Sequence, residues 1–158
     1  DITPLGLGFS TGLMSRMRSC ANHCDFCFVD QMPPGMRETL SAKDDDWRLS
    51  FIMGNYVTLT NVSDAEFERM LKRKAGPLYI SVHATHPEIR EGLMHNKNAG
   101  KLLSRLRALK DAGITFHCQV VACPGLNDGE ILTETMADLA ALYPQCGSLA
   151  VVPVGINQ

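Results

Sequence analysis

The sequence has little excess of charge of either sign. Its formal net charge is −2 over 158 residues, from 15 basic and 17 acidic side chains. This near balance gives no electrostatic reason to expect nucleic acid as a partner. A local basic patch stays open at Arg16, Arg18 and 72–74, although solvated surface charge explains the same residues.

The chain also lacks a long apolar run, a secretory leader and an initiating methionine. No stretch is long enough to cross a bilayer, and Asp1–Pro4 shows no charged segment followed by an apolar one. We therefore expect a cytoplasmic protein without membrane contact, and the missing methionine indicates a fragment of a longer protein. The length suits a single domain over 1–158 with its own core.

Cysteines are too sparse for a disulfide scaffold, at six in 158 residues, and they are unevenly spaced. Cys20, Cys24 and Cys27 fall within eight positions and have the spacing C-x3-C-x2-C. Thiolates are soft ligands that suit iron–sulfur clusters, zinc and copper(I). A [4Fe–4S] cluster ordinarily takes four cysteines, so three local ligands predict a cluster with one iron left open.

Two other readings of these cysteines remain. They bind zinc if His23 or a remote cysteine supplies a fourth ligand, or they are structural residues clustered by chance. An electron carrier is a further rival, but it would be expected to have four cysteine ligands. We expect Cys118 and Cys123 to be small buried hydrophobic residues. The position of Cys146 after a helix indicates no function.

Strands and helices alternate along the chain. We expect strands at 5–12, within 49–60, and at 78–83, 114–122 and 148–154, and helices from Ser63 to Gly76, at 98–112 and at 129–142. Ser63 and Glu66 have the spacing of a capping box at the start of the first helix. Asp44–Asp46 is a short acidic run of the kind that usually marks a solvated turn.

The later strands are apolar enough to be buried on both faces, which predicts an α/β fold of parallel units with right-handed crossovers. Four or five such units form either an open doubly wound sheet or part of a (β/α) barrel. Both architectures place active sites at the carboxyl ends of the strands. The cysteine loop is expected to follow the first strand.

The cysteine segment resembles the signature of the radical S-adenosylmethionine superfamily, C-x3-C-x-aromatic-C, with Phe26 as the aromatic residue. Other segments are similar to one bacterial branch of poorly characterised iron–sulfur proteins, which carry a PDZ-like domain before the radical core and a domain of unknown function after it. These segments are 27–33, 43–51, 54–61, 79–85, 123–129 and 151–155.

The resemblance implies an enzyme whose core is a partial (β/α) barrel, excised here from its flanking domains. Three thiolates would hold three irons of a [4Fe–4S] cluster, and S-adenosylmethionine would chelate the fourth iron through its amino and carboxylate groups. One electron, from a donor such as flavodoxin or ferredoxin, would cleave the sulfonium and give a 5′-deoxyadenosyl radical. That radical would abstract hydrogen from a substrate that the sequence does not identify.

The sequence departs from the superfamily where a Gly-Gly-Glu type segment usually contacts the methionine amino group. The corresponding stretch contains Thr58, Thr60 and Asn61. Their hydroxyl and amide groups accept hydrogen bonds but carry no charge. Alternatively the threonines are ordinary strand residues and Asn61 is a turn former.

Further cofactor contacts follow from the resemblance. Ser81 and His83 share a face by strand alternation, and His83 is expected to be a catalytic hydrogen-bond donor or a proton relay, unless it is structural. Gln119 is expected to reach the ribose or the carboxylate. Arg48 and the preceding acids resemble a substrate or inter-domain element.

The last expected contacts involve backbone rather than side chains. Gly125 would let the backbone approach a ligand closely, although a plain turn also explains this glycine. Val152 and Val154 are expected to cradle the adenine through backbone groups, and Pro153 between them limits the strand's ladder bonding.

Overall fold

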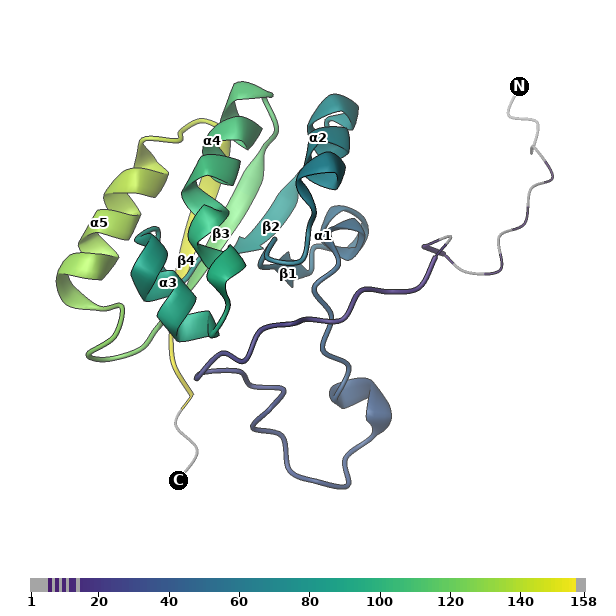
Figure 1. The fold of residues 1–158 in the computed structure, drawn as a ribbon, viewed down its shortest axis with the longest axis horizontal. Helices are drawn as coiled ribbons and strands as arrows, with labels where there is room; N and C mark the ends of the chain where they lie inside the picture. Colours follow the sequence, from purple (N-terminus) through teal and green to yellow (C-terminus); the bar gives the residue numbers. More distant parts are fainter. Residues whose placement is uncertain (1–5, 7, 9, 11, 14, 156–158) are drawn as a thin grey trace.

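The computed structural model describes residues 6, 8, 10, 12, 13 and 15–155 (Figure 1). The helices are α1 (Trp47–Met53), α2 (Asp64–Arg73), α3 (Pro87–Met94), α4 (Leu102–Asp111) and α5 (Gly129–Ala140), with short 3-10 turns η1 (Glu38–Leu40) and η2 (Lys97–Lys101). The strands are β1 (Tyr56–Val57), β2 (Leu78–Ser81), β3 (Phe116–Ala122) and β4 (Cys146–Pro153). No described helix has the length and apolar character needed to span a membrane.

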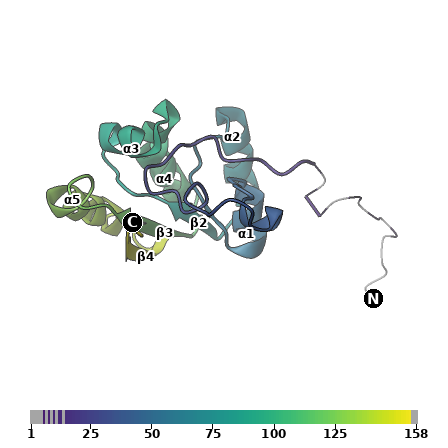
Figure 2. The same cartoon turned by 90° about the horizontal axis from the view of Figure 1, so that it is seen from below.

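The four strands form one sheet in the order β1-β2-β3-β4, and every neighbouring pair is parallel. Figure 2 shows α2, α3, α4 and α5 on the same side of this sheet. A doubly wound sheet reverses its strand order and places helices on both faces, whereas a sequential order with one helical layer is that of a (β/α) barrel segment. The predicted α/β class is therefore confirmed, in its barrel-type form.

The core lies between the sheet and the helical layer. Ile80, Cys118 and Val120 are fully buried and belong to one apolar cluster with Leu106 and Leu109 of α4. The alternate residues of β2 and β3 are only partly buried, and β4 is largely exposed. The expectation that the strands are buried on both faces is wrong, because α2, α3, α4 and α5 all cover the same face.

Helix α2 begins as expected, with half of the predicted capping box. The Ser63 hydroxyl accepts a hydrogen bond from the backbone N–H of Glu66 at 3.3 Å. The Glu66 carboxylate does not complete the box. It accepts hydrogen bonds from the indole N–H of Trp47, at 2.8 Å, and from the guanidinium of Arg18. Glu66 thereby attaches the segment before the sheet to α2.

The strand expected within 49–60 is mostly wrong, because residues 47–53 form α1. The Asp46 side chain caps this helix by accepting from the backbone N–H of Arg48, and Gly54 ends it at φ 78°. These local cap signals outweigh the β-propensity of Phe51 and Ile52. Only Tyr56 and Val57 remain as strand β1. The expected strand over 5–12 falls largely outside the described residues.

The acidic run is not a solvated turn, since Asp45 and Asp46 are 2% and 0% exposed. Asp46 accepts hydrogen bonds from the backbone N–H of Arg18 (3.1 Å) and from Nε (2.9 Å) and Nη2 (2.6 Å) of Arg48. Burial opposes ionisation, but these hydrogen bonds outweigh it and hold the pKa of Asp46 below its ordinary value. Asp46 is thus a charged anchor for Arg18 and Arg48.

We expect Asp46→Asn to lower the free energy of unfolding by about 2 kcal/mol at pH 7, because hydrogen bonds to a charged group are lost. A lowered folded-state pKa stabilises the fold above the ordinary Asp pKa of about 3.9 and ceases to do so as the pH falls through the folded value. The difference between the two proteins, measured by urea unfolding, should therefore shrink below about pH 4. Asp44→Asn is the control, and an equal loss in Asp44→Asn would contradict the assignment.

Candidate functional site

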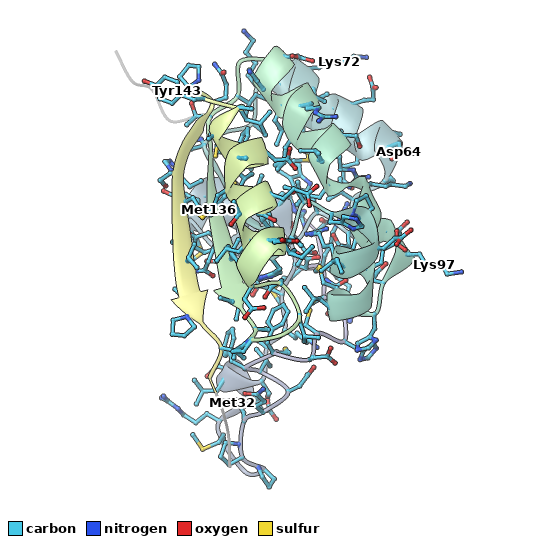
Figure 3. All side chains as sticks on the ribbon, turned by 90° about the vertical axis from the view of Figure 1, so that its left-hand side faces the viewer. Met32, Asp64, Lys72, Lys97, Met136 and Tyr143 are labelled. Atoms are coloured by element: carbon cyan, nitrogen blue, oxygen red, sulfur yellow. The ribbon has the colours of Figure 1, made fainter. Side chains whose placement is uncertain are left out.

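A cavity of about 470 Å³ opens at the carboxyl ends of the strands, against the cysteine loop, residues 20–27. Figure 3 shows Met32, on the segment that follows this loop, beyond the arrowhead of β4. Eight residues predicted as cluster ligands, cofactor contacts or the catalytic residue line the cavity: Cys20, Cys24, Phe26, Cys27, Thr58, Ser81, His83 and Gln119. The structure thus brings together residues that lie up to about a hundred positions apart in the chain.

The cysteine loop is attached to α3, a helix that the sequence analysis missed. The backbone N–H groups of His23 and Asp25 donate to carbonyls of the last two α3 residues, at 3.1 and 3.3 Å. Carbonyls in the last turn of a helix accept no hydrogen bond from within the helix. The cysteine loop therefore caps the end of α3. On the loop's other side, the backbone N–H of Cys20 donates to the carbonyl of Lys43 at 2.8 Å.

The thiols in the cavity are partly buried and mutually close. Burial, and then the neighbouring Cys20 and Cys27, raise the pKa of Cys24 to about 12. Burial also raises the pKa of Cys20. In the absence of a positively charged ligand the Cys20 and Cys24 thiols are protonated at neutral pH, and binding of a metal centre would release their protons.

The donor set fits a cluster better than a single ion. Among the described residues, no group of three or more His, Cys, Asp or Glu side chains is placed to hold one metal ion. Three thiolates on one zinc ion, each about 2.3 Å from it, would lie within about 4 Å of one another. Thiolates on a [4Fe–4S] cluster bind separate irons, so three cysteines that border one cavity fit that group.

Asp45 belongs to the acidic run that was expected to be a solvated turn or a substrate or inter-domain element, and it is a buried carboxylate in the cavity wall. It accepts hydrogen bonds from the backbone N–H of Thr58 at 2.6 Å and from the Thr58 hydroxyl at 2.5 Å. The Thr60 hydroxyl lies 3.5 Å from its Oδ2. Burial raises the pKa of Asp45, although the Thr58 hydrogen bonds oppose this. The stretch after β1 has no acidic residue of its own, but Thr58 and Thr60 contact the carboxylate of Asp45.

His83 is held as a neutral imidazole. Burial, and then the charge of Arg90, lower its pKa to about 3. Its Nδ1 accepts a hydrogen bond from the backbone N–H of Val121 at 3.2 Å, which leaves the proton on Nε2. The ring packs against Phe26, with centroids 4.4 Å apart. Of the two roles expected for His83, this environment favours the donor over the proton relay, because the ring does not take up a proton near neutral pH.

Arg90 of α3 lies beneath the cavity and is 1% exposed. Its guanidinium donates to the backbone carbonyls of Thr58 (3.0 Å), Ser81 (2.8 Å), Val82 (2.8 Å) and Ala99 (2.6 Å). Burial lowers the pKa of Arg90 to about 10, so the side chain stays charged at neutral pH. This one side chain therefore ties together the ends of the strands that carry the cavity wall.

Two of the residues expected to contact the methionine amino group do not line the cavity. Thr60 is buried, and its hydroxyl lies 2.9 Å from that of Thr58. The Asn61 amide donates to the backbone carbonyls of Ser19 (3.3 Å) and Asp45 (2.9 Å). These residues support the wall of the cavity, and only Thr58 faces it.

The three backbone contacts expected later in the chain also lie outside the cavity lining. Gly125 has φ 77°, and its N–H donates to Asp128 Oδ1 at 2.8 Å, so the plain turn accounts for this glycine. Val152 pairs with Val121 in the sheet. The backbone N–H of Val154 donates to the carbonyl of Ala122 at 3.0 Å.

The remaining cysteines lie apart from the cavity lining. The Cys118 and Cys146 sulfurs are 3.8 Å from each other on neighbouring strands, and Cys118 belongs to the apolar core. Cys123 is buried, and its backbone N–H donates to Asn127 Oδ1 at 2.7 Å. The predicted reading of Cys118 and Cys123 as buried residues agrees with this placement.

Comparison with known protein families gives one match. The model of the family described as the Radical SAM-like domain matches residues 1–149. No curated protein matches the chain.

Proposed function

Because the chain belongs to the Radical SAM-like domain family, we propose that it uses a [4Fe–4S] cluster to cleave S-adenosylmethionine reductively. One observation carries the proposal. Cys20, Cys24 and Cys27 border the same cavity as polar residues from the ends of β1, β2 and β3. A three-thiolate site beside an open cavity that also carries polar groups suits a cluster that leaves one iron free for a second ligand.

When bound, the reduced cluster supplies one electron that splits the sulfonium into methionine and a 5′-deoxyadenosyl radical, which takes hydrogen from a substrate. The protein's own task is to bind and orient these groups and to exclude water. Phe26 and His83 pack together in the wall, and their rings restrict the access of water from that side.

The methionine ammonium needs a negatively charged partner, and we assign Asp45 to this task. Asp45 lines the cavity, and its carboxylate is oriented by both hydrogen bonds from Thr58. An ammonium beside Asp45 would favour the ionised carboxyl against the cost of its burial. This assignment replaces the direct contact expected of Thr60 and Asn61, which act instead on the orientation of Asp45.

The polar groups of β2 and β3 would position the rest of the ligand. The Nε2–H of His83 is a donor whose direction is set by the bond to its Nδ1. Ser81 and Gln119 are paired across β2 and β3 and both line the cavity. They offer a hydroxyl and an amide to the carboxylate and ribose of S-adenosylmethionine.

The identity of the electron donor and of the protein branch belongs to the proposal as well. We assign the chain to the bacterial branch with PDZ-like and uncharacterised flanking domains, on the segments quoted above. A flavodoxin- or ferredoxin-type protein would reduce the cluster. The exposed Phe28, 75% accessible beside the three cysteines, marks the side from which such a donor would approach.

The test is anaerobic reconstitution with iron and sulfide, reduction by dithionite, and addition of S-adenosylmethionine. The product to measure is 5′-deoxyadenosine, together with iron and sulfide content. Four irons per chain and formation of 5′-deoxyadenosine are expected from the proposed cluster. A fully loaded cluster without this product would favour an electron carrier, and tight zinc binding without cluster uptake would favour a structural module.

We expect Asp45→Asn to weaken S-adenosylmethionine binding about 10- to 100-fold while leaving iron content unchanged. A charge-assisted hydrogen bond contributes roughly 1.5–3 kcal/mol, and asparagine keeps the shape and an acceptor oxygen for Thr58. Equilibrium dialysis of the loaded protein with labelled S-adenosylmethionine measures the effect. Asp44→Asn removes the neighbouring acid of the same cavity. A larger loss in Asp44→Asn than in Asp45→Asn would overturn the assignment.

A further inference from the structure

Asn22 lies inside the cysteine loop, between Cys20 and Cys24, and is 1% exposed. Its amide Nδ2 donates to Cys20 Sγ at 3.2 Å and to the Thr58 hydroxyl at 3.1 Å. Its Oδ1 accepts from the Thr60 hydroxyl, at 3.0 Å, and from the Asn96 amide, at 2.8 Å. Every polar atom of this side chain therefore has a partner, and one partner is a sulfur at the proposed cluster site.

The orientation of the Asn22 amide is determined by a chain of donors. The backbone N–H of Asn98 donates to Asn96 Oδ1 at 2.9 Å, which fixes the Asn96 amide with its NH₂ group toward Asn22. Asn22 must accept that bond with Oδ1, so its own NH₂ group faces Cys20. The N–H···S contact is thus set by a backbone group outside the cysteine loop.

The loop backbone at Asn22 is fixed as well. The Lys43 ammonium donates to the Asn22 carbonyl at 2.9 Å and to Asp30 Oδ2 at 2.5 Å. Two residues far from Asn22 in the sequence therefore hold it: Asn96 contacts its side chain, and Lys43 contacts its carbonyl. Because Asn22 is already fixed, forming the N–H···S contact costs little side-chain conformational entropy, unlike a contact from a flexible surface side chain.

We propose that Asn22 is a positioning residue that donates an N–H···S hydrogen bond to Cys20 and thereby eases one-electron reduction of the cluster. The inference rests on the proposed function, since it takes Cys20 as a cluster ligand. A donor to a ligating sulfur stabilises negative charge on the centre, and the reduced state carries one negative charge more than the oxidised state. Hydrogen bonds to sulfur are among the factors that set the potentials of iron–sulfur clusters.

The experiment is a redox titration of the reconstituted cluster, followed by electron paramagnetic resonance. Asn22→Leu keeps the branched shape of the side chain and removes the donor. We expect its equilibrium constant for reduction to fall about tenfold, which is a midpoint about 59 mV more negative for one electron. Asn22→Asp keeps an acceptor for Asn96 and Thr60, and the added negative charge should lower the midpoint at least as much.

Asn96→Ser is the matched control. It removes the amide bond to Asn22 Oδ1, but the Thr60 hydroxyl still donates to that atom and keeps the NH₂ group toward Cys20. The reduction equilibrium of this variant should therefore change less than about threefold. Variants of Asn22 that hold four irons with an unchanged midpoint would overturn the inference and leave the proposed function standing. Equal shifts of the midpoint in Asn22→Leu, Asn22→Asp and Asn96→Ser would also overturn the inference. The shift would then come from disturbing the hydrogen-bond network as a whole and not from losing the donor to Cys20. A wild-type chain that takes up no cluster would overturn the proposed function itself.

Discussion

Replacement of Cys24 by alanine is expected to abolish both cluster uptake and formation of 5′-deoxyadenosine. Cys24 lies between the other two thiols in the loop, and both of them act on its pKa. With only two local thiolates left, a second iron loses its protein ligand, and the described residues offer no further cysteine at the cavity. The loss should be complete within detection, measured as iron content, visible absorbance and 5′-deoxyadenosine.

The matched control for this variant is Cys146→Ala. Cys146 is half-buried like Cys24, but its sulfur contacts Cys118 at the opposite end of the sheet from the cavity. Its removal should leave iron content and product formation near wild-type values. If Cys24→Ala retained its cluster and its activity, the ligand assignment would be wrong. If both variants lost the cluster equally, the effect would reflect general destabilisation of the chain.

The cysteine site is predictable from the sequence because its information is local. Three soft ligands within eight residues predict a metal centre regardless of the rest of the fold. The position of the cavity is also predictable, since carboxyl ends of parallel strands meet at one edge of a sheet. These two rules together place Thr58, Ser81, His83 and Gln119 near the cysteines, as the structure shows.

The sequence analysis missed Asn22 and did not foresee the buried role of Asp45, and both residues act through long-range contacts. Asn22 contacts residues at 58, 60 and 96, and Asp45 contacts Thr58 and Thr60. No sequence-spacing rule predicts contacts between positions this far apart. The acidic run that contains Asp45 is, by its composition, typical of solvated surface. Helix α1 is a different case, because Asp46 and Gly54 are recognisable caps. There the signal was present locally, and the β-propensity of the intervening residues obscured it.

Arg90→Met is expected to cost the largest amount of stability, about 3–5 kcal/mol. The substitution removes the guanidinium donor from four buried or partly buried carbonyls, of which that of Val82 keeps the N–H of Ala84. Each buried acceptor left without a partner costs roughly 1–3 kcal/mol before the fold relaxes. A domain of this kind is stable by only about 5–15 kcal/mol, so the variant should be marginal. Urea unfolding at pH 7 measures the loss.

Arg90→Lys should recover little of this stability, because an ammonium cannot reproduce the planar fork that reaches the carbonyls of Thr58, Ser81, Val82 and Ala99 together. Arg107→Met removes an exposed arginine of α4 and should change the free energy of unfolding by less than about 0.5 kcal/mol. A lysine variant as stable as wild type would show that charge alone matters at this position. The fork would then not be what joins β1, β2 and η2 beneath the cavity, and the wall that holds Thr58 and Ser81 would need another explanation.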